Sequence, residues 1–249
     1  MRNFIVVIPA RFASTRFPGK ALADLGGVSV LRRCFMQVER VVPVADIYIA
    51  TDDQRIVSEC ETHNMQWVMT STQCMTGTDR VAQVAETLAA EWYINVQGDE
   101  PFLDPSGLQR VIDTALSADQ DIAVINAFTP LDNEDEFRSP TIPKVVFTQA
   151  GKLLYISRAA IPTNKSLGFS GANRQVGLYA FRPDALSTFA RASEKTPYES
   201  IEDVEILRFL EMGYQVSVVE VPRGGIAIDT PDDLTAARRY LASATDATN

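Results

Sequence analysis

Three cationic side chains lie close together near the start of the chain, in the stretch RFASTRFPGK (11–20). Arg11, Arg16 and Lys20 share this stretch with small residues and with no acidic residue. Small residues let backbone N–H groups approach an anion, and the cations neutralise it, so the stretch predicts a polyphosphate-binding loop. The alternative is a solvated surface turn, which is the usual role of a charged loop.

The loop matches neither of the two common glycine-rich phosphate motifs. The pattern G-x-x-x-x-G-K-[ST] needs a glycine at position 14 and a hydroxyl at position 21, where this chain has Ser14 and Ala21. The dinucleotide pattern G-x-G-x-x-G is also absent from the loop. The residues therefore disfavour a P-loop or a nicotinamide site.

The overall charge restricts what this basic loop can bind. The chain has 249 residues and a net charge of -9, whereas binding to nucleic acid or to an anionic membrane needs extended positive surface. No apolar run is long enough to span a bilayer or to resemble a secretory signal, so we expect a cytoplasmic protein. A local basic cluster then requires a local anionic ligand.

The number and spacing of the histidine and cysteine residues exclude further kinds of catalytic and metal-binding site. His63 is the only histidine, so a His-rich metal site is impossible, and a Ser-His-Asp triad would need that residue. Its place near a predicted helix end favours a solvated side chain. Cys34, Cys60 and Cys74 form no C-x-x-C pair, and we expect them to be buried free thiols.

The first 130 residues alternate between apolar strand patterns and helical spacing. This alternation predicts an α/β fold with a doubly wound, mainly parallel sheet and right-handed crossovers. Ligands of such sheets bind beyond the carboxyl ends of the strands, so the loops after residues 10, 52 and 97 should lie along one edge. The predicted strands are 4–10, 47–52, 67–69, 92–101 and 121–130, and the predicted helices are 28–41, 54–63, 78–90 and 105–117.

The pattern changes near residue 140, although we expect a single domain over 1–249. A hairpin over 144–158 begins a β-rich insertion at about 140–190, which includes a mobile stretch at 166–175. One helix over 199–213 would place Glu199, Glu202 and Asp203 on one face at i, i+3 and i+4. The remaining predicted strands are 176–182, 216–221 and 226–230, and the remaining helices are 183–192 and 231–244.

Two distant aspartates follow apolar strand patterns. Asp99 ends the run YINVQGD and Asp229 ends the run IAID, so both carboxylates should point into one crevice. Asp229 has a second interpretation, as the N-cap of the helix that starts near Pro231.

The cationic loop and its neighbours resemble a known family. IPAR-x-x-S-T-R-x-P-G-K (8–20) is similar to the motif of sugar-nucleotide cytidylyltransferases, in particular the 3-deoxy-manno-octulosonate (Kdo) cytidylyltransferase family. The resemblance extends through most of the chain, with the motifs in the same order as in the family. It implies a nucleotide-diphospho-sugar transferase-like fold. It includes ATDD (50–53), TGTDR (76–80), NVQGDEP (95–101), KVV (144–146), YISRAAIP (155–162), VGLYAFR (176–182), ESIEDVEILR (199–208) and IDTPDDL (228–234).

The resemblance implies a reaction and a set of residues. The anomeric hydroxyl of an acidic sugar attacks the α-phosphorus of CTP, pyrophosphate leaves, and a CMP-sugar for lipopolysaccharide biosynthesis remains. By this analogy the catalytic residues are Arg11, Arg16 and Lys20, and the Mg²⁺ ligands are Asp99 and Asp229. The implied nucleotide-binding residues are Ala10, Arg11, Arg16, Lys20, Gly77, Thr78, Arg80 and Gln97. The implied sugar-binding residues are Gln97, Arg158, Gln175, Tyr179, Glu202, Asp203 and Glu205. Thr78 is also a candidate N-cap, with Asp79 in the first turn.

The chain departs from the family pattern on the acceptor side. Gln175 and Ser200 replace histidines that are common there, and Asp203 replaces a common methionine. Added negative charge and lost imidazoles favour a cation, so we hypothesise an acceptor with an ammonium group, 8-amino-3,8-dideoxy-manno-octulosonate (Kdo8N).

Three alternatives remain open. They are an ordinary Kdo-specific enzyme, an acylneuraminate cytidylyltransferase, and a CTP-binding module without catalysis. The family also implies a homodimer, for which the β-rich segment is a candidate contact surface.

Overall fold

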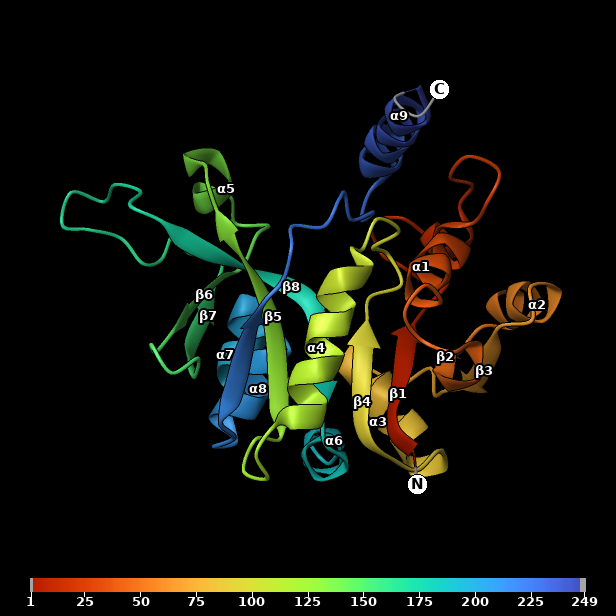
Figure 1. Cartoon of the computed structure of the whole chain (residues 1–249), viewed down its shortest axis with the longest axis horizontal. Helices are drawn as coiled ribbons and strands as arrows, with labels where there is room; N and C mark the ends of the chain where they lie inside the picture. Colours follow the sequence, from red (N-terminus) through yellow and green to blue (C-terminus); the bar gives the residue numbers. More distant parts are fainter. Residues whose placement is uncertain (1, 247–249) are drawn as a thin grey trace.

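The computed structural model describes residues 2–246, in which nine strands form one sheet with helices on both faces (Figure 1). The main strand order is β3-β2-β1-β4-β8-β5-β9, and β8 runs antiparallel to both of its neighbours, β4 and β5. The other pairs along this order are parallel, which confirms the predicted α/β class. The strands are β1 (Arg2–Pro9), β2 (Ile47–Thr51), β3 (Gln66–Met69), β4 (Ala90–Val96), β5 (Val124–Leu131), β6 (Lys144–Phe147), β7 (Leu153–Ser157), β8 (Ala172–Phe181) and β9 (Val216–Glu220).

The helices cover the two faces of the sheet. Helices α1 (Val30–Val38), α2 (Gln54–Thr62) and α4 (Pro105–Ser117) pack on one face, and α3 (Gly77–Thr87), α6 (Pro183–Ala190) and α8 (Ile206–Glu211) pack on the other. The remaining elements are α5 (Glu134–Arg138), α7 (Pro197–Glu202), α9 (Pro231–Asp246) and the 3₁₀ turns η1 (Lys20–Leu22) and η2 (Val44–Asp46). Within residues 2–246, no helix has both the length and the apolar character needed to cross a membrane.

The strand β1 illustrates why the apolar runs form central strands. Ile5 and Val7 pack into the core on one face, and Val6 and Ile8 pack into the core on the other, all without solvent exposure. A strand buried on both faces needs a continuous apolar run, as parallel strands usually show.

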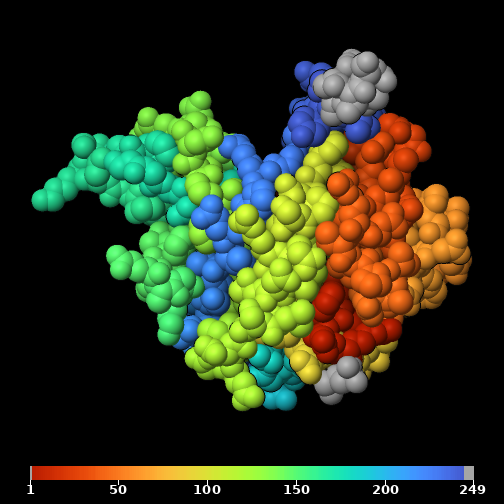
Figure 2. All heavy atoms as spheres, viewed as in Figure 1, coloured from red at the N-terminus to blue at the C-terminus, as the bar shows by residue number. Residues whose placement is uncertain are grey.

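The β-rich part of the chain contains the expected hairpin, β6 and β7, which pair antiparallel. The strand β8 starts at Ala172, so the mobile stretch predicted over 166–175 is wrong for its last four residues. Those residues are held by pairing with β5 and, in part, with β6. The segment 158–171, between β7 and β8, projects from the body of the molecule (Figures 1 and 2).

Two further predictions about the second half of the chain are wrong. The helix predicted over 199–213 is divided into α7 and α8, because Asp203 takes the left-handed conformation (φ 49°). Glu199, Glu202 and Asp203 therefore do not share one helix face. Residues 226–230 form no strand, although the Ile228 N–H donates to the Asp99 carbonyl (2.8 Å) and holds this segment beside the end of β4.

The ends of β1 and β4 approach closely at Gly98. A Cβ at this position would lie 2.6 Å from the Pro9 carbonyl oxygen, so any side chain forces the two backbones apart.

We predict that Gly98→Ala lowers the free energy of unfolding by about 1–3 kcal/mol, because relieving this overlap shifts backbone. Gly224→Ala is the control, since its Cβ would lie 3.9 Å from the nearest heavy atom, and it should change stability by less than about 0.5 kcal/mol. Urea unfolding followed by circular dichroism measures both. Equal stability of the two variants would contradict the prediction.

Candidate active site

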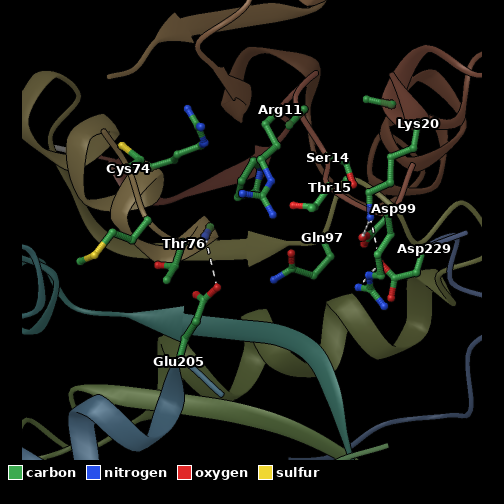
Figure 3. A pocket seen from close by; sticks show the side chains of 18 of the residues that line it. Arg11, Ser14, Thr15, Lys20, Cys74, Thr76, Gln97, Asp99, Glu205 and Asp229 are labelled. Atoms are coloured by element: carbon green, nitrogen blue, oxygen red, sulfur yellow. Dashed lines mark hydrogen bonds and ion pairs between the residues drawn. The ribbon is translucent and has the colours of Figure 1, made fainter. Parts of the chain in front are cut away.

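A cavity of about 290 Å³ opens at the carboxyl ends of β1 and β4 (Figure 3). Four regions far apart in the sequence form its wall: the cationic loop after β1, the segment 74–77 before and at the start of α3, the turn 97–99 after β4, and side chains from 195–229. The predicted edge of the sheet is therefore the edge with the cavity. The predicted residues that line it are Ala10, Arg11, Arg16, Lys20, Gly77, Arg80, Gln97, Asp99, Asp203, Glu205 and Asp229.

Lys20 joins the two distant aspartates. Its ammonium lies 2.5 Å from an oxygen of Asp99 and 3.0 Å from an oxygen of Asp229, which confirms that the two carboxylates converge. Burial lowers the pKa of Lys20, but the two carboxylates outweigh it and raise that pKa above the ordinary value. Burial acts to raise the pKa of Asp229, but Lys20 and Arg16 together leave it below the ordinary value.

The interpretation of Asp229 as a helix cap is wrong. The hydroxyl of Thr230 accepts from the Asp233 N–H (3.2 Å), and the Asp233 carboxylate accepts from the Thr230 N–H (2.8 Å). Thr230 and Asp233 thus form a capping box at the start of α9. The carboxylate of Asp229 instead contacts Lys20 and Arg16, the latter at 2.9 Å.

Arg11 provides charge that the protein itself does not neutralise. Within residues 2–246 its guanidinium makes no ion pair, and it reaches into the cavity above Gln97 and beside Thr15 (Figure 3). Arg16 is 63% exposed at its side chain and can turn toward a ligand. The loop therefore presents two accessible guanidinium groups to an anion.

Arg80 is held rigidly in the wall of the cavity. It is 4% exposed, and its guanidinium donates to the Asp52 carboxylate and to the Thr70 hydroxyl, each at 2.7 Å. Sequence reasoning gave Asp52 no role. Its position directly after β2, at the edge of the sheet where the other site residues were expected, is the signal that could have identified it.

The start of α3 differs from the prediction. Thr76 is the N-cap, in a capping box with Asp79, so the assignment of the cap to Thr78 is wrong. Thr78 is fully buried and does not line the cavity. Its N–H and hydroxyl both donate to the carboxylate of Glu205, which also accepts from the Gly77 N–H.

Two predicted sugar-binding residues, Arg158 and Glu202, contact each other outside the cavity lining. The Glu202 carboxylate accepts from the Ser157 hydroxyl (2.6 Å) and the Arg158 N–H (2.8 Å). The Arg158 guanidinium donates to the carbonyls of Glu202 (2.5 Å) and Asp203 (3.1 Å). These bonds fix the turn that carries Asp203 to the cavity, and a direct sugar contact by either residue stays a prediction.

Gln175 and Tyr179, on β8, also lie outside the cavity lining. The Gln175 amide donates to Asn126 (3.1 Å) and to the Tyr179 hydroxyl (3.4 Å). Between them in the sequence is Gly177, where a Cβ would lie 2.7 Å from Gln97. Because Gly177 has no side chain, the Gln97 side chain can occupy its position in the cavity wall.

Lys195 and Cys74 complete the wall, and sequence reasoning assigned neither to the site. The Lys195 ammonium lies 2.6 Å from Asp203 and lowers the pKa of that carboxyl. Cys74 is half-buried in the cavity wall, and burial raises the pKa of its thiol. Cys34 and Cys60 are buried as expected, but the expected burial is wrong for Cys74. His63 is half-exposed at the end of α2.

Comparison with known proteins identifies the family. Residues 5–218 match the family model described as cytidylyltransferase. A Protochlamydia amoebophila protein named 3-deoxy-manno-octulosonate cytidylyltransferase is 40% identical over 96% of this chain and 94% of its own length. A Syntrophotalea carbinolica protein of the same name is 39% identical over 96% of this chain and 98% of its own length. The chain belongs to the 3-deoxy-manno-octulosonate cytidylyltransferase family.

A solved structure of this cytidylyltransferase type has the same fold. It is described as CMP:2-keto-3-deoxy-manno-octonic acid synthetase complexed with CTP, and it superimposes with a TM-score of 0.90 at 30% identity. The similarity covers 97% of this chain and 99% of that one. The part of the chain that matches the cytidylyltransferase family model, residues 5–218, contains every segment that lines the cavity except the one with Asp229.

Proposed function

We propose that this enzyme transfers CMP from CTP to the anomeric hydroxyl of an octulosonic acid sugar in the cytoplasm and releases pyrophosphate, for lipopolysaccharide biosynthesis. The observation that carries the proposal is one cavity in which Arg11, Arg16 and Lys20 face Asp99 and Asp229. The named relatives, at up to 40% identity over nearly full length, support the same reaction.

The proposed chemistry is a displacement at the α-phosphorus. The anomeric oxygen forms a bond to that phosphorus, the bond to the bridging oxygen of the β-phosphate breaks, and the hydroxyl proton is released. Such a reaction depends on positioning and on neutralised charge more than on a covalent nucleophile. Arg11 and Arg16 would hold the phosphates, and Lys20 would stabilise the charge that develops in the transition state.

The two aspartates fit the Mg²⁺ that the family implies. Both carboxylates already contact one cation, the Lys20 ammonium, and carboxylate oxygens are the ligands that Mg²⁺ prefers. No group of three or more acidic, histidine or cysteine side chains suited to a metal gathers among residues 2–246, so phosphate and water would supply the other ligands. Asp99 and Asp229 would hold Mg²⁺, which would supply charge neutralisation for the phosphates.

The base would bind on the opposite side of the cavity from Lys20. Ala10, Gly77 and Arg80 line the cavity, and Asp52 keeps the Arg80 guanidinium in a fixed position. Backbone groups and a rigid planar guanidinium suit the edge of a pyrimidine ring. Gln97 lies between Thr76 and the group formed by Lys20, Asp99 and Asp229 (Figure 3), so it can contact either substrate.

We predict that Lys20→Met lowers kcat by about 10²–10³-fold, the usual cost of losing a preorganised electrostatic stabiliser. Pyrophosphate release from CTP with Kdo, its 8-amino analogue or N-acetylneuraminate as acceptor measures the effect. Lys152→Met is the control, because that ammonium donates to Gln215 outside the cavity and the variant should keep full activity. A wild-type protein that binds CTP and releases no pyrophosphate would instead favour the non-catalytic alternative.

We also propose that the acceptor is the 8-amino sugar, Kdo8N. Asp203 lines the cavity and already holds an ammonium, that of Lys195, at 2.6 Å. An ammonium on the sugar would take the place of Lys195 at this carboxylate. The ordinary Kdo enzyme remains the alternative, because Lys195 can hold Asp203 in the absence of any substrate cation.

Two substitutions should shift acceptor selectivity in opposite directions. Asp203→Asn removes the negative charge, so the ratio of kcat/KM for the 8-amino sugar to that for Kdo should fall at least fivefold. Lys195→Met removes the competing ammonium, so the same ratio should rise. Steady-state kinetics with both sugars at saturating CTP measures the ratio. A wild-type preference for Kdo that neither substitution changes would refute Kdo8N specificity.

A homodimer is our proposal for the assembly. Leu154 and Leu167, which lie within the β-rich segment 140–190, are 59% and 67% exposed, as expected for apolar residues at a contact surface. Light scattering should give twice the chain mass of 27.4 kDa, and Leu154→Lys should shift the protein toward that single-chain mass. A wild-type protein of single-chain mass at micromolar concentration would contradict the proposal.

A further inference from the structure

The carboxylate of Glu205 lies at the amino end of α3, more than 120 residues away in the sequence. It accepts from the N–H of Gly77 (3.2 Å), from the N–H of Thr78 (3.0 Å) and from the Thr78 hydroxyl. Gly77 and Thr78 are the first two residues of the helix, and the N–H of the third, Asp79, donates to the Thr76 hydroxyl (3.3 Å). Side chains therefore occupy the first three N–H groups of α3.

A free helix start of this kind would attract phosphate. The first N–H groups of a helix have no partner within it, and the helix dipole adds positive potential. Here that helix end belongs to the same cavity as Arg11, Arg16 and Lys20, since Thr76, Gly77 and Glu205 all line it. Without Glu205, the cavity would offer a triphosphate two competing places to bind.

We propose that Glu205 is a positioning residue for the nucleotide: its carboxylate fills the start of α3, excludes phosphate from it, and so directs the triphosphate to the cationic loop. The segment 74–77 is then left free for the base. This inference rests on the proposed function, because it assigns a role within the CTP site. It also differs from the direct sugar contact that the family resemblance implies for Glu205.

The surroundings of Glu205 hold it firmly in this position. Arg208, one turn further along α8, is fully buried, donates twice to Glu199 (2.6 Å each) and lies 3.5 Å from Asp79 of α3. The starts of α3 and α8 are thus joined both through Arg208 and through Glu205. Burial raises the pKa of Glu205, and the three donors from Gly77 and Thr78 act in the opposite direction to favour its charged form. An entering phosphate would have to displace a fixed carboxylate.

The same chain contains a matched control for this arrangement. Glu211, at the end of α8, accepts from the Thr196 hydroxyl (2.5 Å), the Tyr198 N–H (3.0 Å) and the Glu199 N–H (3.1 Å) at the start of α7. The number and type of donors are those of Glu205, but Glu211 does not line the cavity. Its substitution removes an equivalent contact at a helix start that lies outside the cavity lining.

The test uses binding of inorganic tripolyphosphate, measured by isothermal titration calorimetry in magnesium-free buffer, together with steady-state kinetics for CTP. Wild-type protein and Glu211→Ala should each bind one tripolyphosphate per chain. Glu205→Ala should bind a second one, and its KM for CTP should rise at least tenfold with a smaller change in kcat. Glu205→Gln, which keeps the shape and loses the charge, should bind tripolyphosphate at least threefold more tightly than wild type.

Other outcomes would overturn the proposal. If Glu205→Ala and Glu205→Gln keep wild-type tripolyphosphate binding and raise only the KM for the sugar, Glu205 contacts the acceptor directly. If Glu211→Ala changes the CTP kinetics as much as Glu205→Ala does, the effect is a general loss of helix stability. Because the calorimetry needs no turnover, it remains decisive for Glu205 even if the wild-type protein transfers CMP to no octulosonate.

Discussion

Lys20 holds its ammonium between the carboxylates of Asp99 and Asp229, and the rest of the cavity depends on this contact. Two carboxylates this close repel each other unless a cation lies between them, so the pair can form only where the fold delivers a positive charge. The contact joins the loop after β1, the turn after β4 and the segment before α9. Residues more than 200 positions apart thereby become one polar centre with Arg11 and Arg16 at its rim.

Sequence reasoning predicted the sheet and most of the polar centre because these have strong local signals, although the strand expected before Asp229 does not form. A strand that is buried on both faces needs a continuous apolar run, and β1 has one from Phe4 to Pro9 and β4 a shorter one from Trp92 to Ile94. Once such strands are parallel, the residues that follow them necessarily meet at one edge, which is how Asp99 and Lys20 could be expected to converge. The family resemblance added the identity of the anion but was not needed for that geometry.

The missed features depend on contacts that no local pattern encodes. Asp203 takes a left-handed conformation that an aspartate rarely adopts, and this divides an otherwise regular helical pattern into α7 and α8. The turn is stabilised by Arg158, which directly follows β7 and donates to the Asp203 carbonyl. Asp52 and Lys195 likewise gain their roles only from partners further along the chain, Arg80 and Asp203. The cap of α3 is an exception, because the spacing of Thr76 and Asp79 is itself a local capping-box pattern, which the choice of Thr78 overlooked.

The position of β8 has a consequence for how the chain is made. This strand lies between β4 and β5, yet it is synthesised more than 40 residues after β5. During translation, the nascent chain therefore carries two facing strand edges whose N–H and C=O groups have no partner until residue 181 has left the ribosome. Exposed edges of this kind invite pairing with other chains, and pairing across long sequence separations is slow. Assembly on the ribosome is thus a stage at which these strand edges can pair with other chains.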